Sequence, residues 1–323
     1  MAQTITFIGF LSGVCAGIAA MLNHCGSDVL RVLVLVDTPN LWCGSAIAGT
    51  PARLIALGSA LAARGVGVWW VVCDRGTPLA DLPSALGMGW LVHPSVFYGS
   101  PRRLADLVER CRPDVVVASD AEYVVTHGRE MADRLGALLA YEAHDDESAL
   151  STALNEPREL SSRRGSWQAA AVASCDAVTA LTPENADTMR SYGVSDDRLA
   201  VVPNGVDVAA RTAWGPAVES RRLLFLGNLH YAPNAAAARW VATVPALHAG
   251  VCVRIVGRGP QTPASAAVEW VGAVPSGPAF DAIFDEVSLA VAPIGAGSGM
   301  KMKMLDYLAA GLPVLATSEA VQG

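Results

Sequence analysis

Apolar residues are gathered into short runs of strand length, and amphipathic segments of helix length separate these runs. The first clear run, RVLVLV, is apolar at nearly every position, as expected for a parallel strand that is buried on both faces. Helical patterns at 51–64, 101–111 and 121–136 lie between such runs, and Thr182 with Pro183 is a helix-start signal. This alternation predicts an α/β, doubly wound domain. The runs in this part of the chain lie at 31–36, 66–73, 90–93, 114–118, 138–143, 175–181 and 199–202.

The same alternation returns after a turn signal, Pro203-Asn204-Gly205. At 323 residues the chain has room for two cores of ordinary size. We therefore predict an N-terminal domain over 30–204 and a second α/β domain over 205–323, with an apolar extension at 1–29. The second domain has strand-length runs at 223–226, 251–256, 289–293 and 314–316, and helix-length segments at 234–244 and 300–310.

Candidate chemistry is concentrated in one late segment, 287–317. A strand-length run ends in a glycine-rich turn, GAGSG, and a helix is predicted over 300–310. Backbone amides in such a turn and at a helix N-terminus form a natural anion site. Lys301 and Lys303 fall in the predicted first turn, where the helix dipole disfavours each cation by roughly 0.3–1 kcal/mol unless an anion binds. Asp306 shares a face with Lys303, so the alternative is that these two residues pair and both lysines are solvated.

The segment GSGMKMKMLDYLAAGLPVLAT at 297–317 resembles the donor-binding segment of retaining glycosyltransferases of family 4, which have the GT-B fold. Three more segments agree in order and spacing: VVPNGVD at 201–207, LLFLGNLHYAPNAAAARW at 223–240 and VRIVGRGP at 253–260. The resemblance implies two Rossmann-like domains that face a cleft. It also implies transfer of a sugar from a nucleotide diphosphate sugar with retention at the anomeric carbon. Since members of that family continue beyond the strand at which this chain stops, the second domain is expected to be incomplete.

The resemblance assigns roles around the donor diphosphate and ribose. Asp306 takes the place of an acidic residue that binds the ribose, and Ser298 stands where many members have a glutamate. Asn228 stands where many members hold the diphosphate with an arginine. This replacement leaves the phosphate charge to Lys303 and Lys301.

The resemblance also assigns residues around the base and the rest of the donor. Arg258 and the backbone near Val274 flank the base, and Gly49 matches a glycine whose backbone approaches the donor. The full set of donor-binding residues that it implies is Gly49, Asn228, Arg258, Val274, Gly297, Ser298, Gly299, Lys301, Lys303 and Asp306.

His144 follows the predicted strand 138–143, at the edge where open α/β sheets bind ligands. The resemblance implies that it faces the cleft and contacts the donor sugar or phosphate, and it could assist the acceptor hydroxyl. His144 and Lys303 are therefore the candidate catalytic residues; the alternative is a structural histidine at a strand end. Residues 145–147, Asp-Asp-Glu, precede a predicted helix, so we expect them to cap that helix rather than to bind a metal.

Composition limits the classes of binding partner and the cellular compartments that we expect. The net charge is −7 and there is no basic block, which argues against a nucleic-acid partner. Seven scattered cysteines without metal-ligand spacing indicate small core residues in a reducing compartment, so we expect a cytoplasmic protein without a cofactor. Residues 4–22 are uncharged and long enough to span a bilayer but lack a basic leading region. A buried extension and a helix that associates with the membrane are therefore the two alternatives for this segment.

The leading hypothesis is a retaining glycosyltransferase that uses a nucleotide diphosphate sugar and a small-molecule, glycan or lipid-linked acceptor. No acidic residue stands out as a nucleophile, so we expect front-side substitution in which the departing diphosphate takes the acceptor proton. A nucleotide-sugar epimerase of the same fold and an inactive nucleotide-sugar-binding protein are the alternatives. A dinucleotide dehydrogenase is disfavoured because no G-x-G-x-x-G follows the first strand.

Overall fold

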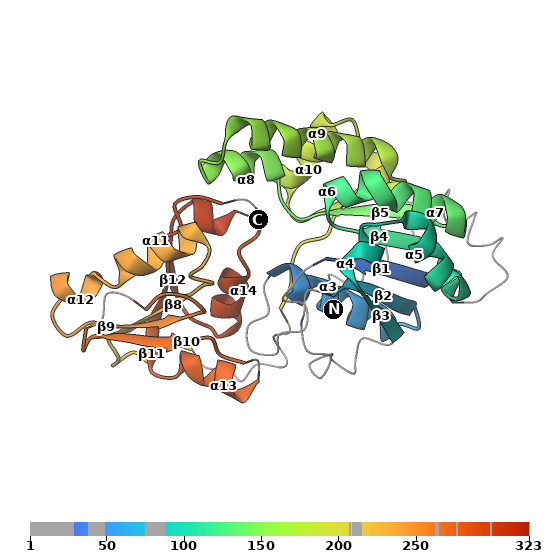
Figure 1. Cartoon of the computed structure of the whole chain (residues 1–323). Coiled ribbons are helices and arrows are strands. Elements are labelled where there is room, and N and C mark those ends of the chain that lie inside the picture. The colour runs from blue at the N-terminus through green and yellow to red at the C-terminus, as the bar shows by residue number, and fades with distance from the viewer. Residues whose placement is uncertain are drawn as a thin grey trace.

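Two all-parallel sheets organise the protein in a computed structural model. The structure describes residues 29–37, 49–74, 88–206, 208, 215–261, 265–275, 277–297 and 299–322. The prediction for residues 4–22 and the assignment of Ser298 therefore lie outside the described residues. Figure 1 shows the sheets in separate lobes, the N-terminal sheet in blue to green and the C-terminal sheet in orange to red.

The N-terminal sheet has seven strands in the order β3-β2-β1-β4-β5-β6-β7, which is the order of a doubly wound Rossmann-like sheet. Both β1 and β5 begin and end where the apolar runs predicted them, and the ends of the other strands lie within two residues of their predicted positions. The strands are β1 (Arg31–Val36), β2 (Gly67–Cys73), β3 (Met88–Val92), β4 (Val115–Ala118), β5 (Leu138–Ala143), β6 (Ala177–Ala180) and β7 (Leu199–Val201).

Four of the helices between these strands begin at side-chain caps of the same kind. Ser100, Asp120, Asp146 and Thr182 each accept a hydrogen bond from a backbone N–H in the first turn that follows. Asp146 thus has the capping role predicted for the acidic run, and Thr182 caps the helix that Pro183 begins. The helices between the strands are α3 (Gly49–Ala62), α4 (Pro94–Phe97), α5 (Pro101–Val108), α6 (Ala121–Tyr123), α7 (Arg129–Leu135), α8 (Glu147–Ala153), α9 (Arg158–Ser174) and α10 (Pro183–Ser191).

Two predicted helices are divided in the structure. The helix predicted over 121–136 contains a π-helical turn, Val124–Gly128, between α6 and α7. The helix predicted over 101–111 ends as a 3₁₀ turn, Glu109–Cys111, and a further 3₁₀ turn, Asp196–Arg198, precedes β7. Apolar periodicity does not distinguish these turns from a regular helix, because the spacing of buried positions changes by only one residue.

The C-terminal sheet has five strands in the order β10-β9-β8-β11-β12. Strand β10 was not predicted, because Val268–Gly272 is only five residues long and a glutamate interrupts its apolar residues. The strands are β8 (Arg222–Leu226), β9 (Cys252–Val256), β10 (Val268–Gly272), β11 (Val287–Ala292) and β12 (Val314–Ala316). The helices are α11 (Ala232–Val241), α12 (Val244–Leu247), α13 (Pro278–Asp281) and α14 (Met302–Ala309), with 3₁₀ turns at Ala282–Phe284 and Glu319–Val321.

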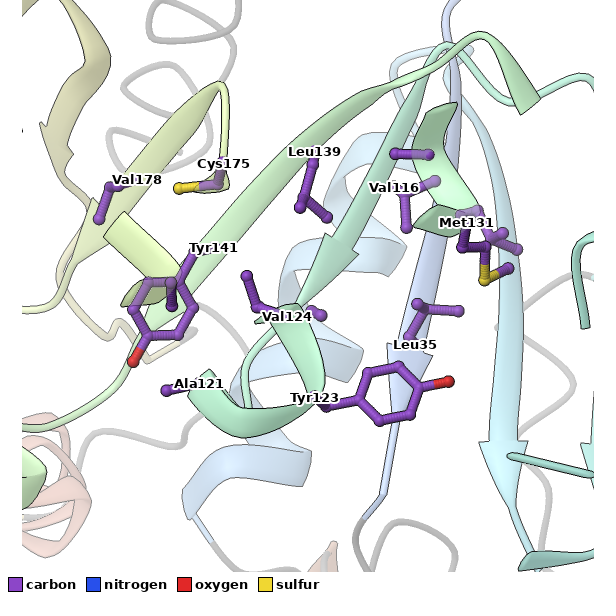
Figure 2. Close-up of a cluster of buried hydrophobic side chains, with 14 of the residues drawn as sticks. Leu35, Val116, Ala121, Tyr123, Val124, Met131, Leu139, Tyr141, Cys175 and Val178 are labelled. Atoms are coloured by element: carbon purple, nitrogen blue, oxygen red, sulfur yellow. The ribbon is translucent and has the colours of Figure 1, made fainter. Parts of the chain in front are cut away.

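Side chains alternate across the N-terminal sheet, so each strand contributes to two cores. Figure 2 shows one of them, where Leu35, Val116, Leu139 and Tyr141 lie with Val124 and other residues of the overlying helical turns. On the opposite face, residues 32, 34, 115, 117 and 140 pack with Leu54 and Leu61 of α3, and a separate core covers the C-terminal sheet. Helices on both faces give the predicted doubly wound fold, whereas the boundary near residue 204 stays a prediction.

No helix within the described ranges combines the length and the apolar character that crossing a bilayer requires.

Candidate functional site

The strand order places two loops side by side at the centre of the C-terminal sheet. The loop after β8 begins at Gly227, and the loop after β11 begins at Pro293. Because β8 pairs with β11 and the order reverses between them, both loops leave the carboxyl edge at the topological switch point. Open α/β sheets bind ligands at this point, and the glycine-rich turn follows one of the two strands.

The helix that carries the lysines starts later than predicted. Helix α14 begins at Met302, not at residue 300, and Lys301 occupies the N-cap position with extended backbone angles of φ −89° and ψ 104°. Only Lys303 therefore lies in the first turn, and the placement of both lysines there was wrong. The Lys301 ammonium donates instead to the carbonyl oxygen of Gly299, at 2.8 Å, which holds the side chain across the glycine turn.

Lys303 is partly buried among uncharged partners. Its Nζ donates to Oδ1 of Asn234 at 2.6 Å and lies over the ring of Phe225, 4.7 Å from the centroid. Burial, with a further contribution from the charge of Lys301, lowers the pKa of Lys303 from its ordinary 10.5 to about 7. The predicted alternative, an Asp306–Lys303 pair with solvated lysines, is not what the structure shows for Lys303.

Lys301 lies nearer to negative charge. Burial lowers its pKa, while the carboxylates of Glu319 and Asp145 act in the opposite direction. Glu319 Oε1 is 3.8 Å from the Lys301 ammonium, at the limit of an ion pair. The two lysines thus form a cationic pair at the start of α14, in which Lys303 has the less compensated charge.

The glycine turn approaches the N-terminal lobe closely. Gly299 is buried with a φ of +63°, and a Cβ there would lie 2.9 Å from the carbonyl oxygen of His144 and would also clash with the Asp145 carboxylate. Only a residue without a side chain fits this position. The glycine turn, with the Lys301 side chain that lies across it, therefore forms one interdomain site with the carboxyl end of β5.

His144 supplies the N-terminal side of that site. Its Nε2 lies 3.1 Å from Oε2 of Glu142, and both side chains are largely buried. Burial raises the pKa of Glu142, but the positive charges of Arg53 and His144 outweigh this effect and lower it to about 2. Glu142 is therefore ionised throughout the neutral pH range, with one carboxylate oxygen close to the imidazole at the strand end.

Asn228 supports the Lys303 site through its backbone carbonyl rather than through its side chain. Its Oδ1 accepts from the backbone N–H of His230 at 3.1 Å, within its own loop, and its carbonyl oxygen accepts from Nδ2 of Asn234 at 3.0 Å. That bond leaves Oδ1 of Asn234 directed to Lys303. The structure therefore links Asn228 to Lys303 through one intervening side chain.

The other predicted residues are spread along the same edge. Arg258 is exposed, and its carbonyl oxygen accepts from Leu229 at 2.7 Å, which joins the loops after β9 and β8. Val274 follows β10 and packs against the C-terminal core. Gly49 is the first residue of α3, and Asp306 lies partly buried one turn beyond Lys303. Gly297, with φ +152°, lies where an added Cβ would be 3.1 Å from the Lys301 side chain.

Sequence reasoning missed three side chains that shape the site. Asn234 and Phe225 hold Lys303, and Glu142 holds His144. The signal for Glu142 was present, since it is the one charged residue in the strand LLAYEA. No comparable signal marked Asn234 or Phe225, because their partner is about seventy positions away.

Within the described residues, no group of three or more His, Cys, Asp and Glu side chains is arranged to hold a metal ion.

Comparison with known protein families agrees with this geometry. Residues 47–210, more than half of the chain, match the family model described as Glycosyltransferase Family 4. The chain belongs to glycosyltransferase family 4. Residues 220–323 match a second model, Glycosyl transferases group 1, which covers the sheet that carries the lysine pair.

Solved structures show that the glycosyltransferase has the GT-B fold. Sucrose-phosphate synthase from Thermosynechococcus elongatus is similar with a TM-score of 0.72 and 14% identity over 90% of this chain and 81% of that one. HepE from Anabaena, in complex with UDP-glucose, has a TM-score of 0.68 and 13% identity over 90% and 80% of the two chains. A protein from Listeria monocytogenes described as a UDP-N-acetylglucosamine 2-epimerase is similar with a TM-score of 0.55 and 11% identity. The match covers 90% of this chain and 79% of that one. No curated protein matches the chain.

Proposed function

We propose that this glycosyltransferase transfers a sugar from a nucleotide diphosphate sugar to an acceptor hydroxyl with retention of configuration. The observation that carries the proposal is the lysine pair at the start of α14. Lys303 is partly buried against a neutral amide and an aromatic ring, at the switch point of the sheet and beside a second cation. A diphosphate at this place supplies the negative charge that the site lacks.

The lysines and the glycine turn act on the leaving group. As the bond from the anomeric carbon to the diphosphate oxygen breaks, negative charge grows on that oxygen. The Lys303 and Lys301 ammonium groups and the backbone amides of 297–301 stabilise this charge. The acceptor oxygen bonds to the anomeric carbon on the same face, and its proton passes to the departing diphosphate.

The remaining donor contacts follow from the order of the loops along the edge. Asp306, one helical turn beyond Lys303, binds the ribose hydroxyls, and Arg258 and Val274, which follow β9 and β10, flank the base. Gly49 and the Asn228 loop complete the donor contacts. Ser298 belongs to the same set.

His144 acts at the sugar or acceptor. It follows β5 on the far side of the glycine turn, so a donor held by the lysines places its sugar next to the imidazole. Contact with a donor hydroxyl or phosphate, or assistance to the acceptor hydroxyl, fits this place.

The experiment is a donor and acceptor screen with the purified full chain. UDP-glucose is the first donor, because HepE, which shares the fold, was solved with it; GDP-, ADP- and dTDP-glucose follow. Each is incubated with small-molecule, glycan and lipid-linked acceptors, and products are examined by mass spectrometry and proton NMR. A product with the anomeric configuration of its donor supports the proposal, and an inverted product contradicts retention.

Control reactions without acceptor separate the other two hypotheses. An epimerase changes the sugar of the donor alone, whereas a transferase leaves it intact apart from slow hydrolysis. An inactive binding protein shows a thermal shift with a nucleotide sugar and no product with any acceptor. Sedimentation with lipid vesicles tests the predicted peripheral membrane association in the same preparation.

A further inference from the structure

A carboxylate lies on the apolar face of a central strand. Figure 2 shows Tyr141 in the core on one side of β5. Because side chains alternate, Glu142 points to the other side, the side on which α3 packs and to which Ala140 belongs. Glu142 is 3% exposed, so the strand buries a negative charge where its neighbours are alanine, valine and leucine.

Arg53 of α3 meets this carboxylate. Arg53 Nε donates to Oε1 of Glu142 at 2.7 Å, and the two side chains are only 3% and 4% exposed. The second oxygen of Glu142 faces Nε2 of His144 at 3.1 Å. Both carboxylate oxygens thus lie beside a nitrogen, one from a helix and one from the strand end, and the contact with Arg53 is the one aligned as a hydrogen bond.

Arg53 also reaches the connection between the two sheets. Its Nη1 donates to Oδ1 of Asn204 at 3.2 Å, and Asn204 is buried although it lies beyond the last residue of β7. A single guanidinium therefore joins three parts of the molecule: α3, the end of β5 and the segment that leads to the C-terminal sheet.

Such a cluster is a poor way to gain stability. Desolvating two charges offsets much of their attraction, and apolar side chains of similar volume commonly stabilise a fold as well or better. The faces of α3 and β5 around the cluster are already apolar. A charged pair in this setting is better explained by the orientation that it imposes on its third member, His144.

We propose that Arg53, Glu142 and Asn204 are positioning residues that fix the imidazole of His144 and connect it to the interdomain segment. The inference rests on the proposed function, in which His144 contacts the sugar or the acceptor. The Glu142 carboxylate attracts the N–H edge of the imidazole across the 3.1 Å contact and so sets the rotation of the ring. Arg53 keeps the carboxylate in place, and Asn204 holds Arg53 against the segment that leads to the C-terminal sheet.

The test compares a single with a double substitution. Glu142→Gln leaves the Arg53 charge buried without its carboxylate, so we expect it to lower both the urea midpoint and kcat. Arg53→Met with Glu142→Gln removes both charges, so we expect the midpoint to recover. If the cluster positions His144, kcat of the double variant stays at least about tenfold low while KM for the donor changes less than about threefold.

A partly buried ion pair elsewhere in the same sheet provides the control. Arg31 begins β1, and Asp114 directly precedes β4, so both lie at the opposite edge of the sheet from His144. Nη2 of Arg31 is 3.1 Å from Oδ1 of Asp114. Arg31→Met with Asp114→Asn should alter kcat by less than about twofold. The proposal is overturned if the Arg53 and Glu142 double variant recovers kcat together with its urea midpoint, because the loss in the single variant was then only structural.

A spectroscopic measurement separates this inference from the proposed function. Nitrogen-edited NMR of the histidine side chains should show a hydrogen-bonded Nε2 proton for His144 in the wild type, assigned with His144→Gln. That signal should be lost or moved upfield in both Glu142 variants. An unchanged signal overturns the positioning role even if sugar transfer is confirmed. If no donor is used, the proposed function fails, and the NMR result still decides whether Glu142 orients His144.

Discussion

The two sides of the interdomain site differ in whether their buried charge has a counter-ion. On the N-terminal side, Glu142 is surrounded by Arg53 and His144, and these positive charges lower its pKa to about 2. On the C-terminal side, Lys303 contacts a neutral amide and a phenyl ring, and burial lowers its pKa to about 7. Figure 1 shows α14, which carries that lysine, on the side of its lobe that faces the other lobe.

The difference indicates what each side does. A charge that has a counter-ion before any ligand arrives holds its neighbours in one arrangement, which suits an orienting residue. A cation that is buried without a counter-ion is at its least favourable, and it becomes favourable when an anion binds. The N-terminal side is thus organised in advance, whereas the C-terminal side is completed by the substrate.

The largest expected effect comes from removing the uncompensated charge. Lys303→Met keeps the length and apolar stem of the side chain, so the fold should be retained, but the leaving diphosphate loses its principal cation. We expect kcat/KM for the donor to fall about 10²–10³-fold, measured by product formation. Lys301→Met is the matched comparison, with a loss of about tenfold, since Glu319 already offsets part of its charge. Near-normal turnover of the Lys303 variant would place the diphosphate elsewhere.

The next prediction concerns the close approach of the glycine turn to the end of β5. Gly299→Ala forces a Cβ against the His144 carbonyl oxygen and the Asp145 carboxylate at a φ of +63°, so the two sides must separate. A loss of about tenfold in kcat is expected from strain of this kind. Gly295→Ala is the control, because nothing lies within 4 Å of its added Cβ, and its kcat should stay within about twofold. Equal activities for the two variants would contradict the close approach.

A smaller effect concerns stability and pH. Between pH 7 and 10.5 the unfolded chain holds a proton on Lys303 that the folded protein has released. The unfolded state then binds more protons, so the free energy of unfolding contributed by this residue rises with pH across that interval. Urea titrations at pH 7 and pH 9 should therefore show the wild type gaining stability relative to Lys303→Met. Parallel changes in the two proteins would mean that Lys303 is not desolvated.

Much of the fold could be predicted from the pattern of apolar residues. Strands β1 and β5 coincide with their predicted limits because buried parallel strands are apolar throughout. The start of α14 was misplaced because the glycine turn extends through Lys301, and backbone angles of a turn are not encoded in hydrophobicity. Strand β10 has only five residues, with a glutamate among the apolar ones, and this is too short for a periodic signal.

The candidate site was predicted less completely than the fold. The glycine turn, Lys303 and His144 could be proposed from the sequence because turn residues and strand ends have recognisable signals. Their partners could not be found in the same way: Arg53 and Glu142 are 89 positions apart, and Lys303 and Asn234 are 69 apart. Contacts at such separations depend on the strand order, which a single sequence does not specify.

The most direct test of the central claim is calorimetric titration of the wild type and Lys303→Met with UDP, GDP, ADP and dTDP at pH 8. Each titration is repeated in two buffers of different ionisation enthalpy. A bound diphosphate favours the charged form of Lys303, so the account predicts that the wild type takes up nearly one proton with its preferred nucleotide. The variant should bind at least about tenfold more weakly and without that uptake. Equal affinity and equal proton exchange in the two proteins would contradict the account.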